Sequence, residues 1–304
     1  MGINRDRLFS NTGSSEPASD PALNLPALEI GALLRTHQLF PRKGLGQNFL
    51  SDPGVLRRIV QAAELPADAT VLEVGPGLGS LTRYLSRAAK HVVAVELDAH
   101  LLPALEEVLG GFGNVEIVQG DILELDPAAL AGETGYFVVA NIPYNITSAL
   151  IRHLLEARVK PLRIVLTVQR EVAERICAGP GDMSLLALSV QIYGQPSIAM
   201  RIPAGAFIPP PNVDSAVVRV DLYDQPRVPA DGLTAFFRLI KAGFSQKRKT
   251  LRNALSGGLR LSGAQAEDLL RSAGIDPMRR AETLAIEEWG KLVTVYQALD
   301  KIDG

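Results

Sequence analysis

The sequence predicts an α/β fold in which a doubly wound, mostly parallel sheet is followed by a small C-terminal all-helical domain. Short apolar runs alternate with helical patterns over residues 52–168, which is typical of consecutive βαβ units covered on both faces. Two later apolar runs, at 198–202 and 216–222, predict an antiparallel hairpin at one edge of the sheet. From about Asp231 onward the pattern is purely helical.

Each element follows from a local signal. Asp52 followed by Pro53 indicates a helix start. Residues 71–74 form a short apolar run that ends in glycines, as a buried strand does. Further strands are expected at 91–95, 115–118, 136–140 and 163–168, and helices at 80–89, 98–109 and 147–157.

The composition divides the chain into three parts and limits its class. Residues 1–35 are expected to form a flexible tail, because residues 10–26 are rich in Ser, Asn, Pro and Ala. Residues 36–223 hold the sheet domain and residues 224–304 the helical domain, with a proline-containing linker at 223–230. Hydrophobic residues make up 47% and charged residues 21%, which predicts a packed core rather than global disorder.

Several classes of protein are disfavoured by what the sequence contains. Cys177 is the only cysteine, which excludes an internal disulfide framework and cysteine-only metal clusters. No apolar run reaches the roughly 18 residues of a membrane span, and the N-terminus lacks a signal-peptide core. We therefore expect a cytoplasmic protein without membrane contact. No His, Cys and carboxylate cluster has metal-ligand spacing, so no metal is expected.

A glycine-rich turn with the sequence EVGPGLG covers residues 73–79, between an expected strand and an expected helix. Glycines there let the backbone pass close to a ligand at the carboxyl end of the sheet. Dinucleotide enzymes prefer the spacing G-x-G-x-x-G. The G-x-G-x-G spacing of Gly75, Gly77 and Gly79, preceded by an acidic residue, resembles the turn that binds S-adenosylmethionine.

Two acidic residues follow on the next two strands. Glu96 ends the second strand, where a carboxylate can accept hydrogen bonds from both ribose hydroxyls of an adenosine. Asp121 follows the third strand, within reach of an adenine amino group. Taken alone, Glu96 could be a solvated strand end and Asp121 a helix cap. The order of glycine turn, Glu96 and Asp121 on three successive strands favours an adenosine-containing cofactor.

The segment Asn141-Ile142-Pro143-Tyr144 directly follows the fourth strand. The Asn141 side-chain oxygen and the Ile142 carbonyl can accept both hydrogens of an adenine N6. That contact favours a pyramidal nitrogen and stabilises positive charge in the transition state. Tyr144 can stack on the face of an unstacked base. Because stacking uses the ring face, the sequence predicts that Tyr144→Phe has a mild effect.

The chain resembles the small-subunit (16S) rRNA adenine N6,N6-dimethyltransferase family (KsgA/RsmA/Dim1). The resemblance rests on the glycine turn and on KGLGQNFL at 43–50, NIPYN at 141–145, FIPPPNVDSAVV at 207–218 and FSQKRKTLRN at 244–253. It implies a Rossmann-like S-adenosylmethionine methyltransferase sheet. It also implies dimethylation of two adjacent adenosines near the 3′ end of small-subunit rRNA in an assembling 30S particle, as part of ribosome biogenesis.

The resemblance also implies site residues. The expected cofactor contacts are Asn48, Leu50, Gly75, Gly77, Glu96, Asp121 and Asn141. The expected catalytic residues are Asn141, Ile142, Tyr144 and Phe207, with Phe207 facing Tyr144 across the target base. The family usually has Leu where this chain has Ile142, a residue that also occurs in the related macrolide-resistance enzymes of large-subunit rRNA. That enzyme type and a non-catalytic assembly factor remain the alternatives.

A local basic stretch predicts the RNA-binding surface. The formal net charge of the chain is only −2, yet residues 232–266 contain seven basic residues and no acidic one. Such a concentration of cations favours a phosphate-binding surface, although a solvated helix face is the ordinary alternative. The residues expected to bind RNA are Lys247, Arg248, Lys249 and Arg252. We expect the protein to act as a monomer.

Overall fold

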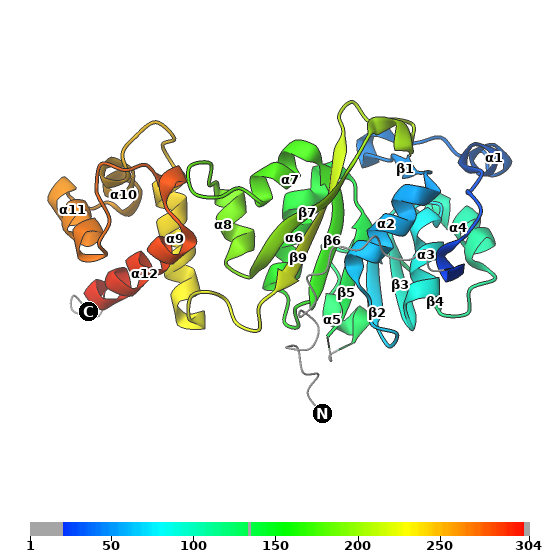
Figure 1. Cartoon of the computed structure of the whole chain (residues 1–304), viewed down its shortest axis with the longest axis horizontal. Coiled ribbons are helices and arrows are strands. Elements are labelled where there is room, and N and C mark those ends of the chain that lie inside the picture. The colour runs from blue at the N-terminus through cyan, green and yellow to red at the C-terminus, as the bar shows by residue number, and fades with distance from the viewer. Residues whose placement is uncertain (1–20, 133–134, 301–304) are drawn as a thin grey trace.

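The computed structural model describes residues 21–132 and 135–300, and places a sheet-containing part beside a helical part (Figure 1). Within these residues, one sheet of seven strands has the order β4-β3-β2-β5-β6-β9-β7. Its strands are β2 (Thr70–Val74), β3 (His91–Glu96), β4 (Val115–Gln119), β5 (Phe137–Asn141), β6 (Arg163–Gln169), β7 (Gly194–Ile202) and β9 (Ser215–Leu222). A separate antiparallel pair joins β1 (Phe49–Leu50) to β8 (Phe207–Ile208).

The sheet has a doubly wound parallel core. Strands β2 to β6 pair in parallel, whereas β9 is antiparallel to both β6 and β7. The strand order reverses between β2 and β5, the point where such sheets form ligand sites outside their carboxyl ends. The α/β fold class is therefore confirmed. The late antiparallel pair is also present, but β9 lies inside the sheet and only β7 occupies the edge.

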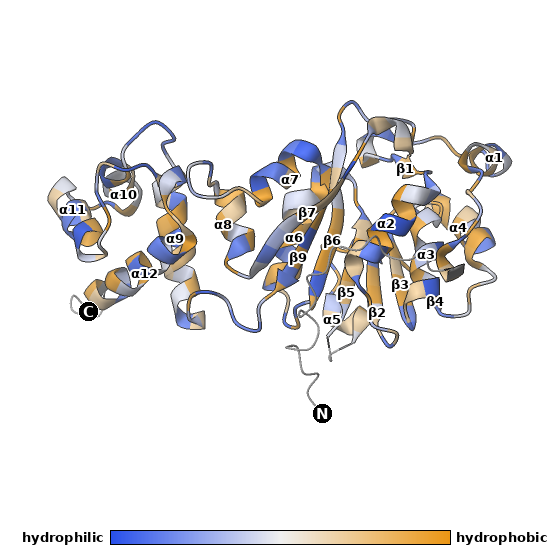
Figure 2. Cartoon of the chain, in the orientation of Figure 1, coloured by the Kyte–Doolittle hydropathy of each residue, from blue (hydrophilic) through white to orange (hydrophobic). Residues whose placement is uncertain are grey.

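Helices cover both faces of the sheet. Val139 and Val165 pack with α2 (Pro53–Ala63) and α3 (Ser80–Ala88) on one face. Val138 and Leu166 pack with α6 (Thr147–Glu156), α7 (Arg170–Ile176) and α8 (Leu185–Gln191) on the other. Figure 2 shows hydrophobic colour along β2, β3, β5 and β6, as expected of strands buried on both faces. The remaining helices of this part are α1 (Ile30–Thr36), α4 (Leu102–Leu109) and α5 (Pro127–Ala131).

Four helices follow the sheet: α9 (Leu233–Phe244), α10 (Leu251–Leu259), α11 (Gly263–Ser272) and α12 (Ile286–Asp300). Helices α9 and α10 touch closely, because a Cβ on Gly258 would lie 2.5 Å from the Ala242 Cβ. The helical part is also joined to the sheet part. The Gly181 N–H donates to the Glu282 carbonyl at 2.8 Å, and Phe236 belongs to the same core cluster as Leu166. The division into domains at residue 223 stays a prediction.

The expected flexible tail is wrong for residues 21–35. Leu23 and Ile30 are buried there. The Arg83 guanidinium donates two hydrogen bonds of 3.2 Å to the Pro26 carbonyl, and the Tyr84 hydroxyl donates to the Leu25 carbonyl. Residues 1–20 lie outside the described part of the chain. In the parts that are described, no helix combines the length and apolar character that crossing a membrane requires.

Candidate active site

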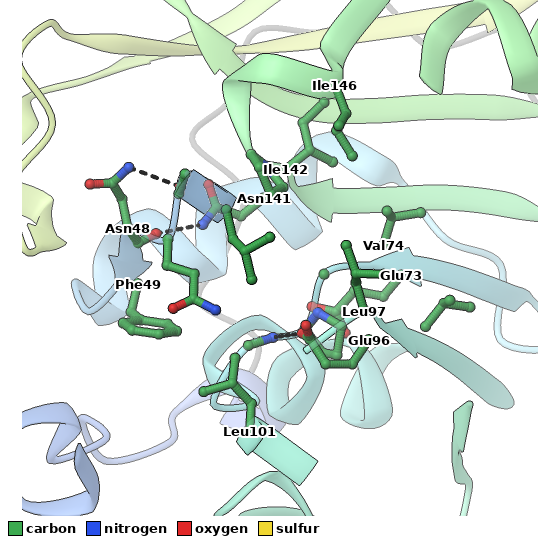
Figure 3. Close-up of a pocket in the computed structure, with 18 of the residues that line it drawn as sticks. Asn48, Phe49, Glu73, Val74, Glu96, Leu97, Leu101, Asn141, Ile142 and Ile146 are labelled. Carbon is green, nitrogen blue, oxygen red and sulfur yellow. Dashed lines mark hydrogen bonds between the residues drawn. The ribbon is translucent and has the colours of Figure 1, made fainter. Parts of the chain in front are cut away.

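A cavity opens at the carboxyl ends of β2, β3, β4 and β5, where the strand order reverses (Figure 3). The segments that line it are 45–50, 73–78, 80–81, 95–97, 101, 120–122 and 141–146. The structure therefore brings together most of the residues that the sequence singled out. They are Asn48, Leu50, Gly75, Gly77, Glu96, Asp121, Asn141, Ile142 and Tyr144.

The glycine turn forms the floor of the cavity. Gly75 and Gly77 have φ angles of +68° and +59°, in the left-handed region that favours glycine. A Cβ on Gly77 would lie 3.1 Å from the Phe49 ring, which packs over the turn. The Gly77 N–H donates to Glu96 Oε2 at 3.0 Å, so the turn is fastened to the end of β3. A side chain at Gly77 would strain the backbone and displace Phe49.

Glu96 is 5% exposed, and both carboxylate oxygens accept backbone hydrogen bonds. Oε2 accepts from Gly77, and Oε1 accepts from the Asp98 N–H at 2.8 Å. Burial raises the pKa of Glu96 above its ordinary value, although these N–H groups oppose the shift. Each oxygen has a second lone pair with which to accept a hydroxyl proton. Asp121 caps the next turn, where its Oδ1 accepts from the Leu123 N–H at 2.9 Å, and it also lines the cavity.

Asn141 and Ile142 sit where β5 meets the cavity. The Asn141 Nδ2 donates to the Asn48 carbonyl at 3.2 Å, across the cavity from β3 (Figure 3). That bond fixes the amide so that its oxygen is available to N–H donors. Ile142 is 2% exposed and its side chain belongs to the core. Ile142 also lines the cavity, so the change from Leu to Ile alters packing between the core and the cavity wall.

Tyr144 lines the cavity and is held by its hydroxyl. The Tyr144 hydroxyl and the Ser215 Oγ are 2.6 Å apart, and Ser215 is fully buried in β9. Phe207 does not join Tyr144. Its ring is 2% exposed and packs in the core with Leu50, while the next residue, Ile208, is exposed. The expected pair of rings around a base is therefore not formed in this structure, because the β1–β8 register turns Phe207 inward.

This geometry changes what we expect of Tyr144→Phe. The phenylalanine would leave the Ser215 Oγ buried without its partner, which costs about 1–3 kcal/mol of stability. We expect Tyr144→Phe and Ser215→Ala to destabilise the protein by similar amounts, and the double variant to lose less than their sum. Chemical denaturation of the four proteins measures this cycle. Additive losses would show that the two hydroxyls do not interact.

The predicted RNA-binding residues lie away from the cavity, in the helical part. Lys247, Arg248 and Lys249 are exposed in the connection between α9 and α10. Arg252 differs from them because its side chain is already engaged. Its Nε lies 3.2 Å from Glu267 Oε2 and donates to the Gly263 carbonyl at 3.2 Å. Arg252 therefore has a structural role between α10 and α11.

Glu73, which begins the glycine turn, is a buried carboxyl that lines the cavity. Its Oε2 has no hydrogen-bond partner among the residues that the structure describes. Burial raises the pKa of Glu73 to about 8; the Thr82 side chain opposes this shift, and the nearby Glu96 carboxylate adds to it. A buried acid at the edge of a cavity favours a ligand that carries positive charge. Within residues 21–132 and 135–300, no group of His, Cys, Asp or Glu side chains could hold a metal ion.

Fold and cavity place the protein in the class of Rossmann-like S-adenosylmethionine-dependent methyltransferases. Residues 40–298 match the model of the ribosomal RNA adenine dimethylase family. The chain belongs to this family.

Individual relatives agree with that assignment. The chain is 48% identical to the "Ribosomal RNA small subunit methyltransferase A" of Dehalococcoides mccartyi (strain CBDB1), over 92% of this chain and 95% of the relative. It is 43% identical to the protein of the same name from Alkaliphilus oremlandii, over 82% and 90%. Among solved structures, a dimethyladenosine transferase from Plasmodium falciparum is similar with a TM-score of 0.72 and 26% identity, over 82% of this chain and 98% of that chain. The 23S rRNA methyltransferase ErmE is similar with a TM-score of 0.68 and 29% identity, over 82% and 100%.

The cavity residues fit S-adenosylmethionine. The cofactor carries a sulfonium and an ammonium group, and Glu73 presents a buried carboxyl oxygen that has no hydrogen-bond partner in the described part of the chain. Its ribose has two hydroxyl groups, and Glu96 has an unused lone pair on each oxygen. The structure also reveals residues that the sequence did not single out as functional, namely Gln47, Asp98 and Ser215, and it gives Glu73, the acidic residue before the glycine turn, a place in the cavity. Gln47 and Asp98 flank residues assigned to the cofactor, and Ser215 lies within the motif at 207–218.

The buried Glu73 predicts how stability without cofactor depends on pH. Its pKa is about 8 in the folded protein against 4.5 ordinarily, so between these pH values the folded state binds the extra proton. Raising the pH through this window therefore favours unfolding. We expect Glu73→Gln to flatten the fall of melting temperature above pH 5 and to be more stable than the wild type near pH 9. Thermal denaturation of both proteins from pH 5 to 9 measures this, and parallel curves would contradict it.

Proposed function

We propose that this protein transfers methyl groups from S-adenosylmethionine to N6 of two adjacent adenosines near the 3′ end of small-subunit (16S) rRNA. It acts as a cytoplasmic monomer on an assembling 30S particle and has a role in ribosome biogenesis. One observation carries the proposal: Asn141 and Tyr144 line the same cavity as Glu96, Asp121 and the glycine turn. The residues assigned to the cofactor and the residues assigned to the target base are therefore two sides of one cavity.

The cofactor side of the cavity would be held by three carboxyl groups. Glu96 accepts hydrogen bonds from the ribose hydroxyls, and Asp121 accepts one from the adenine amino group. Glu73 lies next to the positively charged end of the cofactor. Asn48, Leu50, Gly75 and Gly77 shape the walls around it. When bound, S-adenosylmethionine supplies a methyl group that its sulfonium already activates.

The task of the protein is then to prepare the nucleophile. Adenine N6 is a poor nucleophile because its lone pair is delocalised into the ring. The Asn141 Oδ1 and the Ile142 carbonyl accept its two hydrogens, which favours a pyramidal nitrogen with the lone pair directed at the methyl group. These acceptors also stabilise the positive charge that develops on nitrogen. The nitrogen would gain a methyl group as the bond between that methyl and the sulfonium sulfur breaks, and it would release a proton to water. A second cofactor molecule would supply the second methyl group, with one hydrogen of the monomethylated nitrogen left for these acceptors.

The base must leave its stack before it can react. Tyr144 offers a ring face inside the cavity, and stacking on an aromatic ring compensates for part of the unstacking. Ser215 holds the Tyr144 hydroxyl, so the ring edge is fixed before the base arrives. Selection of the two adenosines would come from the shape of the rRNA, because phosphate contacts carry little sequence information.

The exposed connection between α9 and α10 is the proposed phosphate-binding surface. We expect neutralising Lys247, Arg248 and Lys249 together to weaken binding to small subunits and to lower the log–log salt slope by roughly 0.7–0.9 per lost contact. Arg252→Gln should change the slope less, because Glu267 already pairs with that guanidinium. Binding measured across a salt series compares the variants. Slopes equal to that of the wild type would assign the RNA surface elsewhere.

Purified particles test the proposed reaction. Small subunits that lack the modification are incubated with the protein and with S-adenosylmethionine labelled in the methyl group. We expect label in small-subunit rRNA, recovered as N6,N6-dimethyladenosine, and none in large subunits. Label in large-subunit rRNA would instead favour an activity like that named for ErmE. Binding to small subunits without any transfer would indicate a non-catalytic assembly factor.

A further inference from the structure

The segment 42–48 forms a wall of the cavity and is fastened to both of its sides. Its last four residues, Leu45 to Asn48, line the cavity directly. On the side of β5, the Asn48 carbonyl accepts the Asn141 amide, as Figure 3 shows. Gly46 also lies against Pro143, since a Cβ there would be 3.2 Å from the proline Cβ. This side of the segment therefore contacts Asn141 and Pro143, which belong to the stretch 141–144 assigned to the target base.

On the side of β3, the segment is fastened to one buried carboxylate, that of Asp98. The Gln47 Nε2 donates to Asp98 Oδ2 at 2.9 Å, and the Arg42 Nη1 donates to Asp98 Oδ1 at 3.2 Å. The Arg42 backbone N–H donates to Gln47 Oε1 at 2.8 Å, so the Gln47 side chain joins the backbone at residue 42 to Asp98. The Asp98 side chain is 3% exposed, whereas the Arg42 side chain that pairs with it is 50% exposed.

Asp98 is also bonded to the residue that we assign to the ribose. Its backbone N–H donates to Glu96 Oε1 at 2.8 Å, and Glu96 Oε2 accepts from Gly77. A continuous set of hydrogen bonds thus runs from the glycine turn through Glu96 and Asp98 to Gln47. A shift of the Glu96 carboxylate would therefore be passed on to segment 42–48 through Asp98.

The groups around Asp98 keep it charged. Burial raises its pKa, but the Gln47 amide, His100 and Arg42 together outweigh burial and hold the pKa below its ordinary value. His100 contributes through its backbone N–H at 3.2 Å and its ring Nδ1 at 3.0 Å. His100 is exposed and does not belong to the wall segment, so it offers a matched control.

From this set of contacts we infer that Asp98 is a positioning residue, which couples occupation of the ribose site at Glu96 to closure of segment 42–48 over the cavity. The inference rests on the proposed function, because it takes the ligand at Glu96 to be the cofactor. Asp98 itself touches neither cofactor nor base. Its effect passes through Gln47 and Arg42 to the wall, and through Asn48 to the Asn141 amide.

Limited proteolysis reports on the segment directly. Arg42 and Lys43 are exposed trypsin sites within it. We expect S-adenosylhomocysteine, the methyl-transfer product, to slow cleavage at these sites in the wild type. Asp98→Ala should be cut faster without ligand and should lose most of the protection, whereas His100→Ala should behave like the wild type. If Asp98→Ala fails to fold, Gln47→Ala takes its place with the same expectation.

Calorimetry with S-adenosylhomocysteine completes the test. Asp98→Ala and Gln47→Ala should each weaken binding by about tenfold, and the double variant should bind no more weakly than either. Additive losses, or wild-type cleavage and affinity in Asp98→Ala, would overturn the inference. Absence of binding by the wild type would instead contradict the proposed function. In that case the faster cleavage of Asp98→Ala without ligand still decides whether Asp98 holds the segment.

Discussion

Replacing Asn141 by alanine is expected to lower the rate of methyl transfer by about 10²–10³-fold, while affinity for S-adenosylmethionine stays within roughly tenfold. The amide oxygen is proposed to bind a hydrogen of N6, a contact that strengthens as positive charge develops. The Asn141 Nδ2 also holds the Asn48 carbonyl, which explains why cofactor binding should not be wholly unaffected. Single-turnover rates at saturating cofactor, with small subunits as substrate, measure the effect.

Asn145→Ala provides the comparison for Asn141→Ala. Asn145 lines the same cavity and carries the same side chain, but it is exposed and has no assigned contact to N6. We expect its rate to fall far less. Near-normal turnover of Asn141→Ala at saturating cofactor would contradict the proposed activation of the nucleophile. Equal losses in both variants would show that the cavity wall, not the position of Asn141, is what matters.

Replacing Glu96 by alanine is expected to weaken cofactor binding by about 10²-fold. The variant removes the proposed acceptor of the ribose hydroxyls, and it also leaves the N–H groups of Gly77 and Asp98 without their partner. The glycine turn and the wall segment would therefore loosen together. Glu96→Gln retains one acceptor oxygen and should lose only about tenfold. Calorimetry with the cofactor ranks the three proteins.

Glu116→Ala is the matched control for Glu96→Ala. Glu116 lies on the neighbouring strand β4 and is exposed, opposite Val93 in the register rather than at the carboxyl end where the cavity lies. We expect its cofactor affinity to equal that of the wild type. An unchanged dissociation constant in Glu96→Ala would mean that the ribose binds elsewhere, and would remove the basis for the role of Asp98.

The succession of strands along the chain could be predicted because the local signals were strong and agreed with one another, whereas the order of the strands in the sheet came from the structure. The apolar run at 71–74 is followed by glycines with positive φ angles, which few other residues adopt. The end of β2 and the start of α3 could therefore both be located from the sequence. Helices α7 and α8 were not predicted, since each has only seven residues and too few turns to show a helical period. The packing of residues 21–35 was missed for another reason. Arg83 and Tyr84 hold it, and they lie more than fifty residues away in the sequence.

Some residues of the candidate site could likewise be predicted from the sequence, whereas others could not. Residues with a chemical role in a short motif, such as Glu96 and Asn141, were found because their position after a strand sets where they lie. Asp98 was interpreted only as the start of a helix, although its side chain also bonds to Gln47. Ser215 stood in a quoted motif, but nothing in the sequence placed it beside Tyr144. The Tyr144–Ser215 pair depends on where β9 lies in the sheet, beside β6. A separate pairing, that of β1 with β8, turned Phe207 into the core.

The central claim is that the protein dimethylates adjacent adenosines of small-subunit rRNA. The most direct test maps N6,N6-dimethyladenosine in both ribosomal RNAs from cells with the gene, without it, and with only the Asn141→Ala variant. The proposed function predicts two neighbouring dimethylated adenosines near the 3′ end of the small-subunit rRNA in the first case, and their loss in the other two. Unchanged modification in cells that lack the gene, or loss confined to large-subunit rRNA, would contradict it.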